Sequence, residues 1–176
     1  RDSDVYRARR TEHRTSRKGM SKIQTRAVRT LDKLDIPYRV LVHAHKARNV
    51  EEAATERGVS RRQVVKSLLV RRPDRTYILA LVRGDHRLSL KKLARVEGVK
   101  ALEMAPQADV PRITGYQVGA VAPLGLRSAD VPVYVDPSIL EESLVTISAG
   151  RHDAGLELNA RDLMHAVSGL EADITE

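Results

Sequence analysis

The feature that most constrains the fold of this chain is a pair of apolar runs joined by a short turn. Residues Val64–Arg71 have the sequence VVKSLLVR and residues Tyr77–Arg83 have the sequence YILALVR, with Pro73 and Asp74 between them. A strand with one solvent-facing side would alternate apolar and polar residues, whereas these runs are apolar almost throughout. The pattern predicts a strand–turn–strand pair in a sheet that is covered on both faces.

The remaining segments alternate between short strands and helices. Asn49 and Glu52 have the spacing of an N-cap with its capping-box partner, and Gly58 suits a helix end, so we expect a helix at Val50–Arg57. Further helices are expected at residues 22–34, 90–97 and 160–167 (closed by Gly169), helical turns at 60–63, 106–113 and 137–142, and strands at 38–43, 101–104, 131–135, 144–148 and 155–158. This order predicts one α+β domain with a mixed, barrel-like β-sheet and surrounding helices.

The composition excludes several classes of protein. With 176 residues the chain can bury a core of its own, and no apolar run approaches the ~20 residues that a membrane span requires. The absence of Cys excludes disulfides, thiolate metal sites and a cysteine nucleophile, and fits a cytoplasmic protein. Only 3% of residues are aromatic, which argues against a single-stranded nucleic-acid binder that stacks bases on aromatic rings.

The net charge of +8 is divided unevenly along the chain. Residues 1–19 form a short polar stretch with seven basic and three acidic residues, and Met20 follows it directly. We expect residues 1–19 to be a basic, disordered extension and residues 20–176 to be the folded domain. The domain itself is only mildly basic, which is compatible with a phosphate-bearing partner and does not identify one.

A glycine-rich stretch, Thr114–Gly125 (TGYQVGAVAPLG), is a candidate site. It contains Gly115, Gly119 and Gly125 together with Pro123, so its backbone can adopt positive φ at several points and is stiffened at one. Such a loop can direct several backbone N–H groups at a carbonyl or an anion. The sequence alone leaves equally open that the loop only connects two elements.

Lys66 is the second candidate, because it interrupts the first apolar run. Burying an unpaired ammonium group costs free energy, so a lysine that points inward usually has an anionic or carbonyl partner. Alternatively Lys66 extends from a strand edge or lies on a solvated face, although Val64 and Leu68 would share that face. Both interpretations stay open at this point.

Other chemistry finds less support. His43 and His45 could bind a metal ion, but a zinc site needs at least three protein ligands and no third one is close in sequence, so we expect no metal and no cofactor. Nucleophile-elbow, Walker and dinucleotide-binding motifs do not occur. What remains is a cation, a glycine-rich loop and a small-residue loop at Ser148–Gly150, which could polarise a carbonyl or hold a phosphate.

Five segments together resemble the YbaK/prolyl-tRNA-synthetase-associated domain family. They are Glu51–Ala54 (EEAA), Val65–Val70 (VKSLLV), Thr114–Gly125, Ile147–Gly150 (ISAG) and Asn159–Leu163 (NARDL), in the order and approximate spacing of that family. The similarity covers roughly residues 22–170. It implies a compact α+β domain with a mixed, barrel-like sheet, and an aminoacyl-tRNA editing activity that hydrolyses the ester of a mischarged amino acid in trans.

The resemblance also implies which residues form the site. Lys66 matches the essential strand lysine, Gly119 and Pro123 match a G-x-x-x-P loop that shapes the amino-acid pocket, and Ser148 and Gly150 match a small-residue loop beside it. The implied catalytic residues are Lys66 and Gly119, and the implied substrate-binding residues are His45, Ser67, Thr114, Tyr116, Ala120, Pro123, Ser148, Gly150 and Asp153. Glu157 is an alternative to Asp153 as the acidic pocket residue.

The function predicted from the sequence is therefore a trans-editing aminoacyl-tRNA deacylase whose partners are a mischarged tRNA and an aminoacyl-tRNA synthetase. One alternative is a non-catalytic module that binds tRNA 3′ ends or aminoacyl-adenosine-like ligands in the same pocket. Another is a general nucleic-acid binder that acts through residues 1–19. The sequence does not identify the amino acid that is edited.

Overall fold

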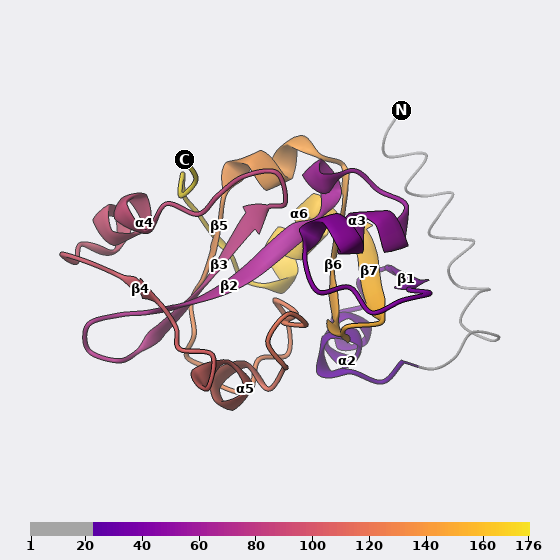
Figure 1. Cartoon of the computed structure of the whole chain (residues 1–176), viewed down its shortest axis with the longest axis horizontal. Coiled ribbons are helices and arrows are strands. Elements are labelled where there is room, and N and C mark those ends of the chain that lie inside the picture. Colours follow the sequence, from indigo (N-terminus) through magenta and orange to yellow (C-terminus); the bar gives the residue numbers. More distant parts are fainter. Residues whose placement is uncertain (1–22) are drawn as a thin grey trace.

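The computed structural model describes residues 23–176, so the predicted extension at residues 1–19 lies outside the described part. Figure 1 shows α4 and β4 at one end of the molecule, and α2, α3 and a small sheet at the other. The elements in chain order are α2 (Arg26–Lys33), β1 (Arg39–Val42), α3 (Val50–Arg57), the 3-10 turn η1 (Arg61–Gln63), β2 (Val65–Arg71), β3 (Tyr77–Arg83), α4 (Leu90–Glu97), β4 (Glu103–Met104), α5 (Asp109–Thr114), β5 (Val133–Val135), η2 (Pro137–Glu141), β6 (Leu144–Arg151), β7 (Ala154–Asn159), α6 (Ala160–Ala166) and β8 (Leu170–Glu171).

The strands form two sheets. One is mixed, with the order β4-β2-β3-β5-β8, and the other is antiparallel, with the order β1-β7-β6. A parallel bridge between Val64 and Thr146 links them. The predicted α+β architecture with a mixed sheet is confirmed; within residues 23–176 the barrel-like arrangement does not close into a barrel.

The mixed sheet is covered on both faces, as the apolar runs predict. Along β3, Leu79 and Leu81 are buried in the main core, which is shared with α2, α6 and the antiparallel sheet. The alternate residues of β3, such as Ile78, lie in a second core together with Leu93 of α4 and Ile174 near the chain end. Strand periodicity therefore explains why both faces of β3 are apolar.

The two helices with the clearest end signals match their predicted bounds. Asn49 accepts a hydrogen bond from the Glu52 N–H at the start of α3, and Ser89 accepts one from the Lys92 N–H at the start of α4. Each helix ends at a glycine with positive φ, because that conformation lets the last N–H groups bond back to the helix. Within residues 23–176, no helix is long and apolar enough to cross a membrane.

Several details of the prediction for the C-terminal third of the chain were wrong. Helix α6 stops at Ala166, and the residue with positive φ after it is Ser168 instead of Gly169. The short strand β8 was not predicted, and β6 continues past Ser148 to Arg151. Strand β8 has only two residues, both exposed, so it carries no apolar pattern that could predict it.

One edge of β2 positions the site. Strand β4 pairs with β2 only at Val70 and Arg71, and the bridge to Thr146 occupies Val64. Between these two points no strand of residues 23–176 pairs with that edge of β2. Side chains from both faces of β2 between Val64 and Val70 can therefore line the space beside this unpaired edge.

Candidate functional site

A cavity of about 440 Å³ lies along the open edge of β2. Its walls come from four parts of the chain: β2, the segment from β1 to the end of α3, the segment between β4 and the glycine-rich loop, and the β6–β7 hairpin. The lining residues are His43, Ala47–Val50, Ala53 and Arg57; Val64–Leu69; Met104, Ala105, Gln107, Val110, Val118, Gly119 and Val121; and Ser148, Arg151 and His152. Sequence segments more than 100 residues apart thus meet at one site.

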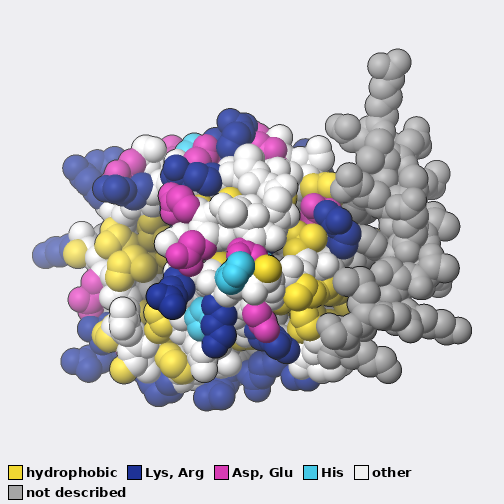
Figure 2. Space-filling model, turned by 45° about the vertical axis from the view of Figure 1, so that its right-hand side comes forward, with side chains coloured by type: hydrophobic (Ala, Val, Ile, Leu, Met, Phe, Trp, Pro, Cys, Tyr) yellow, Lys and Arg dark blue, Asp and Glu magenta, His cyan; other side chains and the backbone are white. Residues whose placement is uncertain are grey.

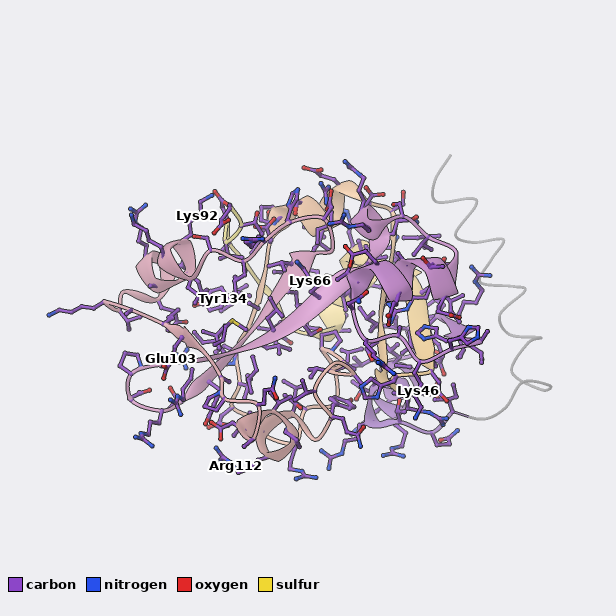
Figure 3. The ribbon with its side chains drawn as sticks, viewed as in Figure 1. Lys46, Lys66, Lys92, Glu103, Arg112 and Tyr134 are labelled. Carbon is purple, nitrogen blue, oxygen red and sulfur yellow. The ribbon has the colours of Figure 1, made fainter. Side chains whose placement is uncertain are left out.

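Lys66 is half-buried on β2 and lines this cavity. Its ammonium group donates a hydrogen bond to the backbone carbonyl of His86, in the turn after β3. The buried Arg83 holds that turn by donating to Asp85 and to His86 Nε2. Figure 3 shows Lys66 near the middle of the molecule, whereas Lys92 lies toward the periphery. Of the two interpretations of Lys66, the structure supports the one in which the lysine lines a pocket.

The surroundings of Lys66 favour loss of its proton relative to a lysine in water. Burial lowers its pKa, and the positive charges of Arg61 and Arg87 lower it further. The carboxylates of Asp85 and Glu51 act in the opposite direction. The same burial that lowers the pKa leaves the ammonium group less solvated than that of a surface lysine, which strengthens its interaction with any ligand oxygen in the cavity.

The lining carries positive charge without acidic residues. Its ionisable side chains are Arg48, Arg57, Lys66 and Arg151 together with two histidines, and no Asp or Glu of residues 23–176 lines the cavity. Arg48 is exposed at the rim, whereas Arg57 is half-buried. Such a lining favours ligands with anionic or strongly polar oxygen groups.

Arg57 and His43 form a hydrogen-bonded chain at one wall. The Arg57 Nε–H donates to His43 Nε2 over 3.2 Å, and Arg57 Nη1 donates to Thr146 Oγ1 over 3.0 Å. Because His43 Nε2 accepts, its Nδ1 carries the proton and donates to the backbone carbonyl of His152 over 2.9 Å. Burial lowers the pKa of His43, in agreement with this neutral tautomer.

His152 connects the hairpin to the glycine-rich loop. Its Nε2–H donates to the Val118 carbonyl over 3.0 Å. Gly119, the next residue, has a φ of +83°, and a Cβ atom there would lie 3.3 Å from His152 Nε2. The loop thus reaches the cavity with an exposed glycine whose backbone conformation suits a residue without a side chain.

Four of the predicted site residues come together at the cavity: Lys66, Ser67, Gly119 and Ser148. The hydroxyl of Ser148 accepts a hydrogen bond from the Gly150 N–H. The hydroxyl of Ser67 is buried, and no group of residues 23–176 forms a hydrogen bond with it. An unpaired polar atom of this kind costs free energy, so it is a candidate to bind a ligand.

Five other predicted residues lie behind the cavity wall. Thr114, Tyr116, Ala120 and Pro123 are buried, and the Tyr116 hydroxyl donates to the Leu124 carbonyl inside the loop. Gly150, with a φ of +90°, is packed against the Tyr116 ring, where a Cβ atom would lie 2.6 Å from Cε1. These residues hold the glycine-rich loop and the Ser148–Gly150 loop together and do not line the cavity.

The remaining predicted residues do not line the cavity, and each bonds to another side chain of the protein. His45 is exposed and hydrogen-bonds to Glu56, 3.0 Å away. Asp153 forms an ion pair with Arg151, and Glu157 forms one with Arg39, so neither carboxylate lines the cavity.

Arg57, His43 and His152 were missed by the sequence-based prediction of the site. An arginine in the last turn of a helix is expected simply because it complements the helix dipole, so Arg57 gave no functional signal. The two histidines interact through contacts more than 100 residues apart in sequence. The sequence singled out His43 only as a possible metal ligand together with His45.

Comparisons with known proteins identify the family of the chain. The family model for the aminoacyl-tRNA editing domain matches residues 44–166. The chain is 27% identical to EbsC of Enterococcus faecalis, a candidate Cys-tRNA(Pro)/Cys-tRNA(Cys) deacylase, over 86% of this chain and 93% of that protein. It is 41% identical to the proline–tRNA ligase of Geobacter sulfurreducens over 56% of this chain, and the match spans only 16% of the ligase.

A solved structure agrees in fold as well. The crystal structure of a candidate trans-editing enzyme for prolyl tRNA synthetase has a TM-score of 0.80 and 28% identity, covering 90% of this chain and 99% of the other. The family match extends over more than half of the sequence and includes all four predicted residues that meet at the cavity. The chain therefore belongs to the aminoacyl-tRNA editing domain family.

Proposed function

We propose that this protein is a trans-editing deacylase that hydrolyses the ester bond of mischarged aminoacyl-tRNA. The observation that carries the proposal is the position of Lys66, half-buried on the open edge of β2 in a cavity that also contains Gly119 and Ser148. The editing-domain family and the deacylase name of a relative support the same reaction.

The groups at the cavity suit ester hydrolysis. A water molecule attacks the carbonyl carbon, the bond to the ribose oxygen breaks, and the ribose hydroxyl and the free amino acid are the products. Backbone N–H groups around Gly119 position the carbonyl and stabilise its developing negative charge. Such electrostatic stabilisation is often the largest contribution to catalysis of this kind. Lys66 anchors either the terminal adenosine phosphate or the ester carbonyl.

A ribose hydroxyl of the tRNA is proposed to orient the attacking water, because neither a carboxylate nor His43 can act as a general base in the cavity. No carboxylate of residues 23–176 lines it. Both ring nitrogens of His43 are already engaged, one as donor to His152 O and the other as acceptor from Arg57. A group that must accept a proton needs a free lone pair within reach of the water, which His43 does not have.

The partners of this reaction are a tRNA and, by relation to the proline–tRNA ligases, an aminoacyl-tRNA synthetase. The cytoplasm, where tRNA is charged, is the proposed location. Figure 2 shows Lys and Arg side chains spread over one face of the molecule, with Asp and Glu side chains among them. Contacts between such basic residues and tRNA phosphates would make binding dependent on salt concentration.

The test is deacylation of a panel of mischarged tRNAs by the wild type and by Lys66→Ala. Loss of a group that stabilises the transition state lowers kcat/KM by about 10²- to 10³-fold. The matched control is Lys91→Ala, which removes an exposed lysine of α4 that does not line the cavity and should leave the rate unchanged.

Equal rates for the wild type and Lys66→Ala would contradict the role of Lys66. Saturable binding of aminoacyl-tRNA without turnover of any member of the panel would contradict the deacylase function, and would favour the non-catalytic binding module instead. A tRNA specific for proline is the first to test, because the relatives concern prolyl-tRNA editing and charging.

A further inference from the structure

Arg57 is a cation that lines the cavity without a carboxylate partner. Its Nε and Nη1 donate to His43 and Thr146, both of which are neutral groups. Within residues 23–176 no Asp or Glu forms an ion pair with it, and its Nη2 makes no hydrogen bond to the protein there. Removing a guanidinium from water without a counter-charge is costly, so a ligand that supplies the charge would be favoured.

The protein is built to hold the guanidinium in one place. Gly155 of β7 lies beneath it, where a Cβ atom would lie 2.3 Å from Arg57 Nε and 2.8 Å from Cζ. On one side, His43 is fixed by its bond to the His152 carbonyl, and on the other Thr146 is completely buried. Two of the donor groups are thereby used for orientation, which leaves Nη2 available to a ligand in the cavity that Arg57 lines.

Burial also lowers the pKa of Arg57 to about 10, so the side chain stays protonated at neutral pH. The other cations of the lining have different surroundings: Lys66 is bonded to a carbonyl, Arg151 is paired with Asp153, and Arg48 is exposed. Arg57 is therefore the half-buried arginine of the lining whose charge is not compensated by the described protein.

We propose that Arg57 is a specificity-determining residue that binds an anionic oxygen group of the ligand inside the cavity. The planar guanidinium suits carboxylate and phosphate oxygens, to which it donates short, charge-assisted hydrogen bonds. Two parts of an aminoacyl-tRNA end can supply that chemistry: a side-chain carboxylate of the amino acid, or the phosphate of the terminal adenosine. The identity of the ligand rests on the proposed function, whereas the preference for an anion rests on Arg57 alone.

The test measures binding of non-hydrolysable ligands, so that it does not depend on turnover. The probes are adenosines whose 3′ position carries aspartate or asparagine through an amide bond, each with and without a 5′-phosphate. Titration calorimetry compares the full-length wild type with Arg57→Leu. The matched control is Arg95→Leu, because Arg95 also lies in the last turn of an eight-residue helix that ends at a glycine, but is exposed and distant from the cavity.

A second variant, Gly155→Ala, keeps the positive charge and displaces it. Its methyl group would overlap Nε and Cζ of Arg57, and the guanidinium can be displaced because it is the far end of a long side chain. This variant keeps the proposal testable if Arg57→Leu does not fold. Both variants should weaken binding of the anionic probe by about 10- to 100-fold, as expected for loss of a charge-assisted hydrogen bond, and Arg95→Leu should not.

The four probes identify the source of the anion. If Arg57→Leu removes the preference for aspartate over asparagine, Arg57 binds the amino-acid side chain. If it removes the preference for the 5′-phosphate, Arg57 binds the phosphate. Equal affinity changes for all four probes, or none, would overturn the proposal. Ester hydrolysis is measured separately, so a protein that binds these probes through Arg57 but hydrolyses no ester would contradict only the deacylase function.

Discussion

Gly125 and Gly58 both have a φ of +65°, yet their surroundings differ. A Cβ atom at Gly125 would lie 2.7 Å from backbone atoms of Arg26 at the start of α2, whereas one at Gly58 would have nothing within 4 Å. The glycine-rich loop can therefore pack against α2 only because it ends in a residue without a side chain. At Gly58 a side chain would have room, so glycine is favoured there only by the positive φ.

This difference predicts unequal effects of the same substitution. Gly58→Ala should lower the free energy of unfolding by about 1–2 kcal/mol, the cost of a left-handed conformation with a side chain. Gly125→Ala should cost at least about 1 kcal/mol more, because the backbone of α2 must move. Urea-induced unfolding of the two variants measures both values. Equal losses would show that the contact with Arg26 carries no energetic weight.

Among individual residues, the sequence reveals those with an unusual side chain for their surroundings more readily than those whose contacts form only in the folded chain. Lys66 was a candidate because a charged residue interrupts an apolar strand, and the glycine-rich loop because several glycines gather in it; the family resemblance then singled out Gly119. The role proposed for Arg57 was not predictable, because it rests on contacts with Gly155 and Thr146, which approach Arg57 only in the folded chain. Tyr116 was predicted at the site but is directed into the loop, since its hydroxyl has a partner there.

Among the elements, helices α3 and α4 were predicted with their observed bounds because local signals define both ends. Side-chain caps and glycine end residues act within one turn, so their effect does not depend on the rest of the fold. The opposite case is β8, whose two exposed residues pair with β5 only because the chain returns to it after α6. The sheet order likewise depends on contacts between distant segments.

His43 joins three elements, and its protonation should loosen them together. It lies between β1 and α3 and bonds to both Arg57 and the β6–β7 hairpin. Its pKa is below the ordinary value of 6.5 because of burial, so the unfolded chain binds more protons than the folded chain just below that pH. The contribution to stability is therefore complete above pH 6.5 and decreases as the pH falls toward the folded pKa.

Thermal or urea unfolding between pH 7.5 and pH 5 tests this effect. The slope attributable to His43 cannot exceed about 1.4 kcal/mol per pH unit, the value for one proton. His43→Gln does not titrate and should show a shallower decrease over the same range. If wild type and variant lose stability in parallel, the titrating group is not His43.

For the molecule as a whole, Asp136 ties the chain end to the centre. This residue follows β5 and is buried, and its carboxylate accepts hydrogen bonds from the Ile174 N–H and the Thr175 hydroxyl as well as from Ser138. Ile174 in turn belongs to the second core under α4. The C-terminal segment is thus part of the fold of the domain and completes the covered face of the mixed sheet.

Asp136→Asn should consequently weaken the whole domain. An amide in this position turns one acceptor into a donor that faces other donors, which costs about 1–3 kcal/mol when the groups are buried. The exposed Asp130→Asn serves as the control and should change the free energy of unfolding little. Hydrogen exchange of residues 172–176 and urea unfolding measure the effect; unchanged protection in Asp136→Asn would show that other contacts hold the chain end.

The open edge of β2 has a consequence outside catalysis. An unpaired strand edge in any protein can accept a strand from another molecule and so begin aggregation, and native sheets often prevent this with a lysine. Here the edge between Val64 and Val70 is flanked by α3 and the glycine-rich loop, and Lys66 lies on it. The residue proposed to act on the substrate therefore also opposes pairing of this edge with a neighbouring strand, at the same opening that is proposed to admit a tRNA end.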